Sequence, residues 1–333
     1  MERSADFLVD PEVFRGVYVL TGPTASGKSE VGLLLAEALG AEIVSMDSMA
    51  VYRGLDIGTA KPGPQERARV KHHLLDVLDP WEGANVAWWL RQAAGVCQDL
   101  ARRGQKALIV GGTPMYLKAL LRGLFAGPAA QPALREHLAR LPGDHLHARL
   151  REHDPEAARR IHPHDIRRLV RALEVIQLTG QPLSAMQHQF AQIRWHGPVP
   201  VWLAWPRQVL YRRIEERVDR MLAAGWLDEV RRLEHLPRPL SHVARQALGY
   251  RELLEYLDGV RSWEDTITLI KTRSRQFARR QLSWFRHLPE LRAVVVHPED
   301  SPQTVAERIL ALWRPNDPDS ATQVRSSHPG CTR

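Results

Sequence analysis

The stretch Gly22-Pro23-Thr24-Ala25-Ser26-Gly27-Lys28-Ser29, called the P-loop below, has the spacing G-x-x-x-x-G-K-[ST] of a phosphate-binding loop. An apolar run, Val17–Leu20, precedes it and apolar residues at helical spacing follow, which predicts strand, loop and helix in that order. Loop amides and the positive end of such a helix converge on phosphate oxygens. Lys28 would add a charge, and Ser29 would offer a hydroxyl to Mg²⁺, whose other ligands come mostly from phosphate and water. The loop therefore predicts a diphosphate or polyphosphate ligand, but it leaves the reaction open.

The composition predicts a globular protein with an anionic partner. Hydrophobic residues make up 44% and charged residues 25% of the 333 residues, which is ordinary for a soluble chain. The formal net charge of +8 makes nucleic acid the first candidate, and a generally basic enzyme is the alternative. Cys97 and Cys331 lack metal-ligand spacing, and no apolar run approaches the ~20 residues that span a bilayer. We expect a cytoplasmic protein.

The order of apolar runs and helical patterns predicts an α/β fold: a P-loop NTPase-like core with a mostly parallel sheet, plus an all-helical insertion domain. We expect strands over residues 17–20, 41–45, 73–77, 107–110, 199–203 and 293–296. We expect helices over residues 28–39, 86–102, 207–224, 226–235, 244–257, 263–287 and 302–313. The domain boundaries that we predict are a loose leader over 1–15 within a first core part over 1–125, a helical, tRNA-binding insertion over 126–192, a second core part with C-terminal helices over 193–314, and a disordered tail over 315–333.

Two polar groups follow predicted strands beside the P-loop. Asp47 comes directly after the second strand, and ligands of open α/β sheets bind outside the carboxyl ends of the strands. Most P-loop ATPases and GTPases also place an Asp for Mg²⁺ at the end of such a strand. The strand over 107–110 ends instead in Gly111-Gly112-Thr113, which argues against a motor or switch and predicts a close approach of substrate to the backbone.

Two arginine-rich helical patterns carry much of the positive charge. Arg167 and Arg171 are four residues apart, and Lys271, Arg275 and Arg279 repeat at the same interval. Arg280 and Arg286 extend the second pattern. Solvated helix faces account for most runs of this kind, but two of them in a basic chain with a P-loop favour contacts with a nucleic-acid backbone.

With these residues assembled, the chain resembles the bacterial tRNA dimethylallyltransferases of the IPP transferase family. The match runs over residues 17–287. The P-loop is shared by many folds, and the long blocks Asp47–Pro62 and Arg279–Arg286 are far more specific. The remaining stretches that carry the resemblance are Gly111–Thr113, Arg160–Pro163, Arg167–Glu174, Arg213–Arg217, Gly249–Glu252 and Thr272–Arg273.

The resemblance implies transfer of a dimethylallyl group from dimethylallyl diphosphate to N6 of an adenosine beside the anticodon, at position 37 of tRNAs that read codons starting with U, with Mg²⁺. The P-loop, Gly22 to Ser29, would then hold the diphosphate of the prenyl donor. Asp47 would take the amine proton, and Lys28, Thr113 and Arg217 would lie at the reaction centre. A monomer acting on the anticodon arm is implied. The family's RNA contacts map onto Asp47, Ser48, Met49, Ala50, Thr113, Arg135, Arg167, Arg168, Leu169, Val170, Arg171, Gln246, Gly249, Tyr250, Arg251, Arg279, Arg280, Gln281, Trp284 and Arg286.

Two departures and three alternatives stay open. Many relatives carry Gln where this chain has Ala50, and a residue other than Pro at 114. A small-molecule P-loop kinase would use Asp47 as a base but leaves the basic helices unexplained. An adenylate isopentenyltransferase would do the same chemistry on a free nucleotide. A non-catalytic RNA-binding module would leave Asp47 and Lys28 without a role.

Overall fold

The computed structural model describes residues 7–187, 190 and 192–313. They divide into two compact units. The larger unit runs from Glu12 to Leu117 and resumes at Trp195, and the smaller comprises Lys118–Arg194 with the described N-terminal residues up to Pro11. The predicted tail over 315–333 lies outside the described residues.

The larger unit is built on a six-stranded sheet with the order β3-β2-β4-β1-β5-β6. Every pair of neighbouring strands is parallel, so the expected α/β fold with a parallel sheet is confirmed. Parallel sheets are covered on both faces, and the central strands accordingly consist mostly of buried apolar residues. The strands are β1 (Tyr18–Thr21), β2 (Ala41–Met46), β3 (His72–His73), β4 (Lys106–Gly111), β5 (Val201–Ala204) and β6 (Arg292–Val295).

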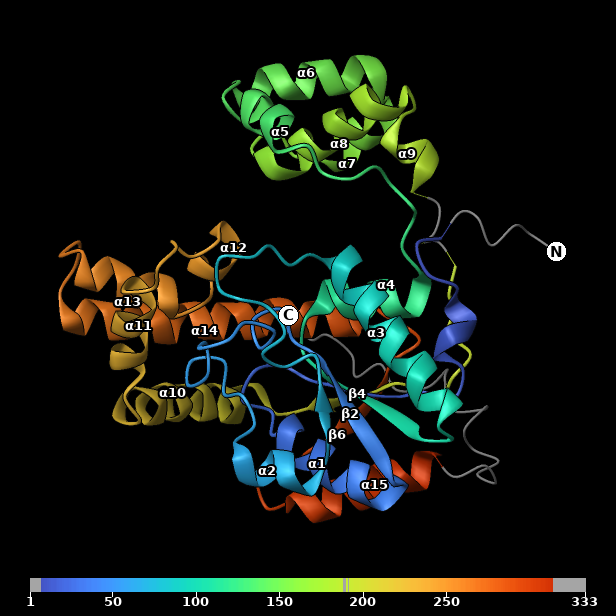
Figure 1. Ribbon diagram of the computed structural model, residues 1–333, viewed down its shortest axis with the longest axis vertical. Coiled ribbons are helices and arrows are strands. Elements are labelled where there is room, and N and C mark those ends of the chain that lie inside the picture. The colour runs from blue at the N-terminus through green and yellow to red at the C-terminus, as the bar shows by residue number, and fades with distance from the viewer. Residues whose placement is uncertain (1–6, 188–189, 191, 314–333) are drawn as a thin grey trace, which may run out of the picture. The chain divides into compact units, whose positions relative to one another are not determined.

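Helices cover both faces of this sheet. α1 and α15 pack side by side on one face, and α3 lies on the other (Figure 1). Trp89 of α3 anchors that second face, because it is fully buried and its indole donates a hydrogen bond to the Ser45 carbonyl of β2 at 2.9 Å. The helices around the sheet are α1 (Lys28–Leu39), α2 (Pro64–Arg69), α3 (Val86–Arg102), α4 (Pro114–Arg122) and α15 (Pro302–Trp313), with a short 3₁₀ helix at Pro11–Phe14.

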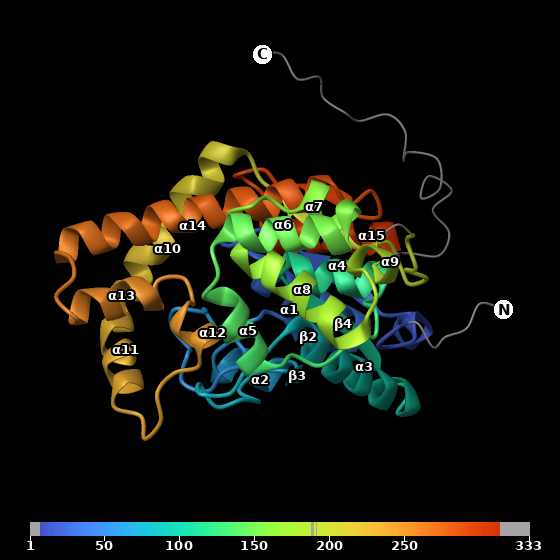
Figure 2. The same ribbon diagram turned by 90° about the horizontal axis from the view of Figure 1, so that it is seen from above.

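A second group of helices in the larger unit packs against the loop that follows β2, and Figure 2 shows it to one side of the strands. Trp226 lies in its core, where a Cβ atom added to Gly58 or to Gly249 would approach the indole to 2.2 or 2.0 Å. Glycine is therefore the residue that fits at both positions. The helices of this group are α10 (Arg207–Ala223), α11 (Trp226–Glu234), α12 (His242–Arg245), α13 (Tyr250–Leu257) and α14 (Trp263–Arg286).

The smaller unit is helical and has a core of its own, formed by apolar residues such as Leu146, Leu150 and Leu173. Phe7 forms an antiparallel bridge with Phe125, and the Leu8 amide donates to the Leu124 carbonyl at 2.8 Å. The described part of the leader is therefore bound rather than loose, which corrects that expectation. The helices of the smaller unit are α5 (Pro132–Ala139), α6 (Gly143–His153), α7 (Pro155–Arg160), α8 (Ile166–Thr179) and α9 (Leu183–Met186).

Two elements differ from prediction for local backbone reasons. The helix expected over 244–257 is broken into α12 and α13, because Gly249 has a φ of +85°. The strand expected over 73–77 ends at His73, because Leu74 and Asp76 have φ values of +61° and +55°. Among the residues that the structure describes, no helix has the length and apolar character needed to cross a bilayer.

Candidate active site

A cavity of about 600 Å³ lies in the larger unit at the carboxyl ends of β1, β2 and β4. Lys28 and Ser29 of the P-loop line it, and so do Asp47, Thr113 and Arg217. The four residues predicted at the reaction centre therefore surround one space. Helices α10 and α14 contribute further walls, including Val218, Met221 and Phe277, so the cavity also has an apolar part.

The P-loop backbone has the shape that phosphate binding requires. Ala25 and Gly27 have φ values of +63° and +82°, and a non-glycine residue in this region stores strain that neighbouring contacts must hold. Trp205 Nε1 donates to the Ser26 carbonyl and Arg213 Nε to the Ala25 carbonyl, each at 2.9 Å. These bonds fix the carbonyls and leave amides at the start of α1 for an anion.

Ser26 supplies a further sign of a ligand in the P-loop. Its side chain is 2% exposed, and its hydroxyl has no hydrogen-bond partner among the described residues. A Cβ atom on Gly22 would approach this hydroxyl to 2.7 Å, so glycine leaves room for it. A buried hydroxyl without a partner costs free energy, and an oxygen of a bound diphosphate is the kind of acceptor that would satisfy it.

Three charged side chains of the cavity influence one another. Burial and then the positive charge of Arg217 lower the pKa of Lys28 to about 8, while Asp47 opposes the shift. Burial also lowers the pKa of Arg217, against the effect of Asp47. Two cations that repel each other beside one carboxylate form a site that gains by taking up a further anion.

Asp47 is held by its own loop. Its Oδ1 accepts hydrogen bonds from the amides of Met49 at 2.8 Å and Ala50 at 3.2 Å, while Oδ2 has no partner among the described residues. Thr113 Oγ1 accepts from the Ser48 amide at 3.1 Å, which ties the end of β4 to the same loop. This geometry leaves one carboxylate oxygen available to a ligand.

Gln281, which the resemblance places among the tRNA contacts, is instead buried beside the P-loop. Its side chain is 2% exposed, and its Oε1 accepts from the Thr24 amide at 2.9 Å. Its Nε2 donates to the Gly112 carbonyl at 2.7 Å. One amide from α14 therefore joins the P-loop to the loop after β4.

Several other predicted tRNA contacts are also engaged inside the protein. The Tyr250 hydroxyl donates to buried Glu229 at 2.6 Å, and burial and then Glu229 raise the pKa of this tyrosine. Glu229 also accepts from the amides of Asp56 at 3.1 Å and Ile57 at 2.7 Å. Arg251 forms an ion pair with Glu255 at 3.3 Å. Tyr250 and Arg251 line the cavity, and these contacts hold their side chains within the protein.

In the smaller unit, the predicted arginines separate into two kinds. Arg135 and Arg171 both bind the fully buried carboxylate of Glu174, at 2.9 and 2.7 Å. Leu169 and Val170 belong to the apolar core, so their side chains do not reach the surface. The exposed arginines of α8 are Arg167, which has no partner among the described residues, and Arg168, which pairs with Asp165 at 3.3 Å.

Among the described residues, no group of three or more His, Cys, Asp or Glu side chains could hold a metal ion. The exposed Ser29 hydroxyl and the unpaired Asp47 oxygen are two of the oxygen ligands that line this cavity. Hard-cation chemistry fits them, since Mg²⁺ commonly binds through one or two protein oxygens together with phosphate oxygens and water.

Comparison with known proteins decides the family. The sequence model of the IPP transferase family matches residues 50–288, and that of the isopentenyl transferases matches residues 15–79. The chain belongs to the IPP transferase family. This membership confirms an enzyme that transfers a prenyl group and removes the support for a small-molecule kinase.

Relatives of this transferase match it over most of its length. It is 45% identical to the tRNA dimethylallyltransferase of Symbiobacterium thermophilum over 302 residues, which cover 89% of this chain and 94% of the relative. The enzyme of the same name from Geobacter metallireducens is 46% identical over 279 residues, which cover 82% and 90%.

Two solved structures resemble the fold of the transferase. The full-length tRNA isopentenylpyrophosphate transferase of Bacillus halodurans is 35% identical with a TM-score of 0.66, and the likeness covers 90% of this chain and 97% of that one. A eukaryotic dimethylallyltransferase acting on tRNA is 28% identical with a TM-score of 0.77, and the likeness covers 89% and 77%.

The sequence alone did not identify the residues that bind the backbone of the site's loops. Trp205, Arg213 and Glu229 support the P-loop and the loop after β2 from positions far along the chain. Lys61, which lies within the block Asp47–Pro62, is buried among three oxygens. No spacing rule reveals such contacts, although the length of that block indicates that more than a catalytic residue is needed there.

Proposed function

We propose that this protein transfers a dimethylallyl group from dimethylallyl diphosphate to N6 of adenosine 37 in tRNAs that read codons starting with U. The products are N6-dimethylallyladenosine and diphosphate. The observation that carries the proposal is one cavity, in a chain of the IPP transferase family, that is lined by both the P-loop and a carboxylate with a free oxygen. The name of the 45% identical relative supports tRNA as the acceptor. A tRNA substrate also agrees with our expectation of a cytoplasmic enzyme, which we expect to act as a monomer.

The P-loop side of the cavity would activate the leaving group. The exocyclic amine of adenine is a poor nucleophile, so the allylic carbon must be made strongly electrophilic. The amides at the start of α1, Lys28 and Arg217 would stabilise the negative charge that develops on the diphosphate as the C–O bond breaks. Mg²⁺, held by Ser29 and the diphosphate, would supply further charge neutralisation. With a pKa of about 8, Lys28 is mostly protonated at neutral pH.

Asp47 would serve the acceptor. As N6 attacks the allylic carbon, the new C–N bond takes the place of the broken C–O bond, and the amine becomes acidic. The free Oδ2 of Asp47 would take the proton, while the two loop amides hold Oδ1. Thr113 lines the cavity beside Asp47 and would contact the adenine or the donor from the end of β4.

The exposed arginines would bind the tRNA. An adenine stacked in an anticodon arm is hidden and must be extruded into a pocket, at a cost of a few kcal/mol. Phosphate contacts could offset that cost, and the structure leaves Arg167, Arg168, Arg279, Arg280 and Arg286 exposed for them. Specific recognition of RNA usually targets such loops.

The test begins with wild-type protein, dimethylallyl diphosphate, Mg²⁺ and an unmodified tRNA. Mass spectrometry should find the mass of one prenyl group on a single adenosine. Asp47→Asn should lower kcat by about 10²–10⁴-fold while both substrates bind within a few-fold of wild type, because Asn keeps the loop hydrogen bonds but cannot take a proton. Asp79→Asn is the matched control, since Asp79 pairs with Arg53 at 2.8 Å in the neighbouring loop and does not line the cavity.

Two results would count against this assignment. A tRNA that stays unmodified with the wild-type protein contradicts the activity itself. Rescue of Asp47→Asn to near the wild-type rate by raised Mg²⁺ or by Mn²⁺ would make Asp47 a metal ligand rather than a base.

A further inference from the structure

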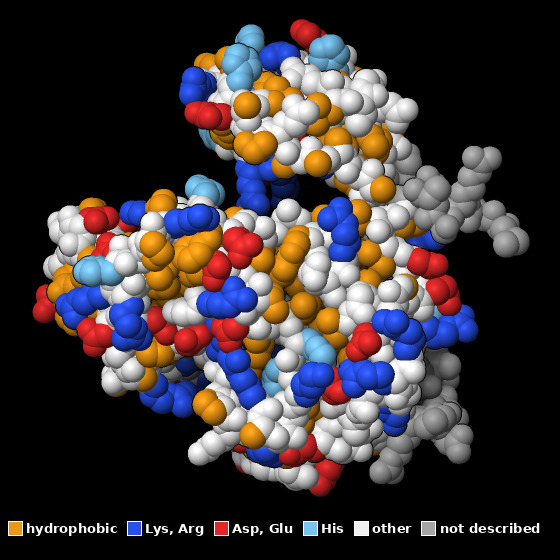
Figure 3. All heavy atoms as spheres, viewed as in Figure 1, with side chains coloured by type: hydrophobic (Ala, Val, Ile, Leu, Met, Phe, Trp, Pro, Cys, Tyr) orange, Lys and Arg blue, Asp and Glu red, His pale blue; other side chains and the backbone are white. Residues whose placement is uncertain are grey.

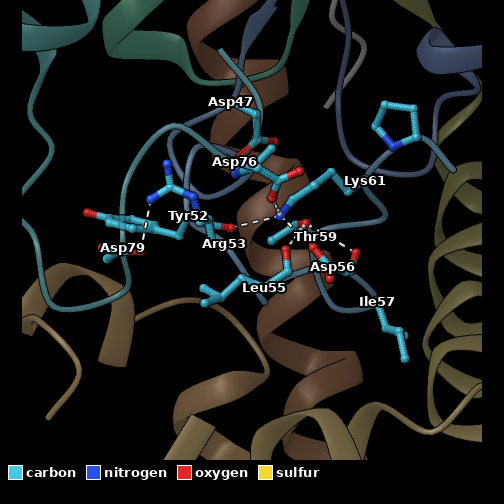
Figure 4. Close-up of polar contacts among 12 residues, drawn as sticks. Asp47, Tyr52, Arg53, Leu55, Asp56, Ile57, Thr59, Lys61, Asp76 and Asp79 are labelled. Atoms are coloured by element: carbon cyan, nitrogen blue, oxygen red, sulfur yellow. Dashed lines mark hydrogen bonds and ion pairs between the residues drawn. The ribbon is translucent and has the colours of Figure 1, made fainter. Parts of the chain in front are cut away.

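Lys61 is buried beside the active-site cavity and makes three close contacts (Figure 4). Its side chain is 1% exposed, and its Nζ donates to the Tyr52 carbonyl at 2.7 Å and to the carboxylates of Asp56 and Asp76 at 2.6 Å each. A lysine ammonium has three N–H donors, so all of them are used within the protein. Lys61 is therefore not available as a second cation for the diphosphate, although it lines the cavity.

One chain of hydrogen bonds leads from Lys61 to Asp47 through Tyr52. Lys61 Nζ binds the Tyr52 carbonyl, and the Tyr52 amide donates to the Met49 carbonyl at 3.1 Å. The Met49 amide then donates to Asp47 Oδ1 at 2.8 Å. The Met49 carbonyl and the Ala50 amide belong to one planar peptide group, so the bond from Tyr52 that fixes this carbonyl also orients the Ala50 amide, which donates to Asp47 Oδ1 at 3.2 Å.

A second chain runs through Asp76 and reaches the same oxygen. Lys61 Nζ binds Asp76 Oδ1, and the Asp76 amide donates to the Ala50 carbonyl at 3.2 Å. The Ala50 amide donates to Asp47 Oδ1 at 3.2 Å. Met49 and Ala50, the two residues whose amides hold the Asp47 carboxylate, are therefore each bound through their carbonyls to a residue that one buried ammonium holds.

Asp76, whose carboxylate binds Lys61, has an unfavourable backbone conformation. Its φ of +55° lies in the left-handed region, which is unfavourable for a non-glycine residue and persists only where neighbouring contacts fix it. Burial raises the pKa of Asp76, yet hydrogen bonds from Lys61 and Arg67 bring it below its ordinary value. The carboxylate thus stays charged for Lys61 at neutral pH.

We propose that Lys61 is a positioning residue for catalysis: by fixing the Met49 and Ala50 amides, it holds Asp47 so that its free oxygen faces the acceptor amine. This inference rests on the proposed function of Asp47 as the base. It differs from a purely structural role in that the effect of Lys61 on the rate must act through the Asp47 carboxylate.

The test is a double-mutant cycle between Lys61→Met and Asp47→Asn, measured as single-turnover prenyl transfer with saturating dimethylallyl diphosphate and tRNA. Methionine keeps the length of the side chain and removes its charge. Lys61→Met alone should slow transfer by about 10- to 100-fold, since a misplaced catalytic group costs a factor of this size, and both dissociation constants should stay near wild type. In the Asp47→Asn background, the same change should slow transfer by less than about twofold, because the group that it positions is no longer a base.

Arg53→Met is the matched control. Arg53 lies on the same loop and pairs with Asp79, but this pair is exposed and neither of the two chains to Asp47 includes it. Its transfer rate should equal that of wild type.

Three outcomes separate the possibilities. An equal loss of rate from Lys61→Met in both backgrounds would overturn the inference and make Lys61 a structural residue only. If Lys61→Met does not fold, Asp76→Asn interrupts the second chain more gently and must show the same coupling to Asp47. If the wild-type protein does not transfer the prenyl group at all, the proposed function fails, and the cycle is not needed to show it.

Discussion

Helices α8 and α14 both carry arginine-rich faces, but they use their arginines differently. On α8, Arg171 joins Arg135 on a carboxylate that is fully buried, that of Glu174. On α14, Lys271 and Arg275 form ion pairs with Asp219 and Glu215 of α10, which keep side-chain exposures of 56% and 42%. Figure 3 shows the same mixing on the face in view, where many Lys and Arg side chains of the larger unit lie beside acidic ones.

The difference teaches that a run of arginines reveals the density of positive charge but not its availability. A buried carboxylate between two guanidiniums cannot release them without leaving its own charge unpaired, whereas an exposed pair contributes little to stability. Each helix also retains arginines without a partner among the described residues, Arg167 on α8 and Arg279 and Arg286 on α14. These are the arginines that we expect tRNA to use.

The largest effect on stability should come from removing the buried charge of Glu174. Glu174→Gln should lower the free energy of unfolding by about 3 kcal/mol, the low end for a broken buried pair, because both arginines keep some access to solvent. Glu215→Gln removes the exposed counterpart on α10 and should cost less than about 1 kcal/mol. Urea denaturation of both variants checks the comparison, and equal losses would contradict it.

The ion pairs of Glu174 should also make the free energy of unfolding depend on pH in the acid range. Burial raises the pKa of Glu174, but hydrogen bonds from Arg135 and Arg171 lower it by more than burial raises it. The pKa of Glu174 therefore lies below its ordinary value. The stability that this group contributes is therefore complete above the ordinary pKa of glutamate and is lost as the pH falls through the lower pKa of the folded state. Glu174→Gln should lack this acid-dependent part of the unfolding free energy.

An intermediate effect should appear in the salt dependence of tRNA binding. Arg279→Ala with Arg286→Ala should reduce the log–log slope of affinity against salt by about one unit per lost phosphate contact, and Arg167→Ala should reduce it by about one unit. Donor affinity should not change. The control, Lys271→Met with Arg275→Met, removes two paired cations from α14 and should leave the slope unchanged. Fluorescence anisotropy with labelled tRNA over a series of KCl concentrations measures these slopes. If the slope of the control variant falls as far as that of Arg279→Ala with Arg286→Ala, ion pairing within the protein does not determine which cations bind tRNA.

The smallest effect concerns a cation inside the cavity. Among the described residues, the Nζ of Lys28 donates to the Pro23 carbonyl at 3.3 Å and to no carboxylate, so Lys28 resembles the arginines without a partner. Its pKa of about 8 means that the free enzyme loses this charge above pH 8. A bound diphosphate favours the charged form, so donor affinity should fall above pH 8 by at most about tenfold per unit. Calorimetry should find that Lys28→Ala binds more weakly and without this dependence.

The sequence predicted most of the fold because its signals are local. The P-loop and the apolar runs located all six strands, and the long amphipathic patterns located α10, α14 and α15 closely. The errors occurred where packing at a distance overrides local preference. Gly249 divides a helix because its backbone must pass Trp226, and nothing in the residues around Gly249 reveals that indole.

The residues of the site likewise include some that local sequence signals predict and others that depend on distant packing. Lys28, Asp47 and Thr113 follow predicted strands or the P-loop, and parallel strands bring their carboxyl ends to one edge of the sheet, so their proximity could be expected from the sequence. The role of Gln281 could not, because it depends on α14 passing close to both Thr24 and Gly112. Likewise, the difference between Arg167 and Arg171 depends on the burial of Glu174 against Arg135 of α5, which the residues of α8 do not reveal.

The packing of Trp226 against Gly58 and Gly249 constrains the order in which this sequence can change. A Cβ atom at Gly58 would approach the side chains of Trp226 and Tyr250 to 2.2 and 2.5 Å, so a smaller residue at 226 is one requirement for alanine there. A smaller residue at 226 would not make alanine acceptable at position 249, because the φ of +85° at Gly249 disfavours any side chain even where space exists. Substitutions at 58 and 226 should therefore be accepted together or in one order, whereas glycine at 249 should persist in either background.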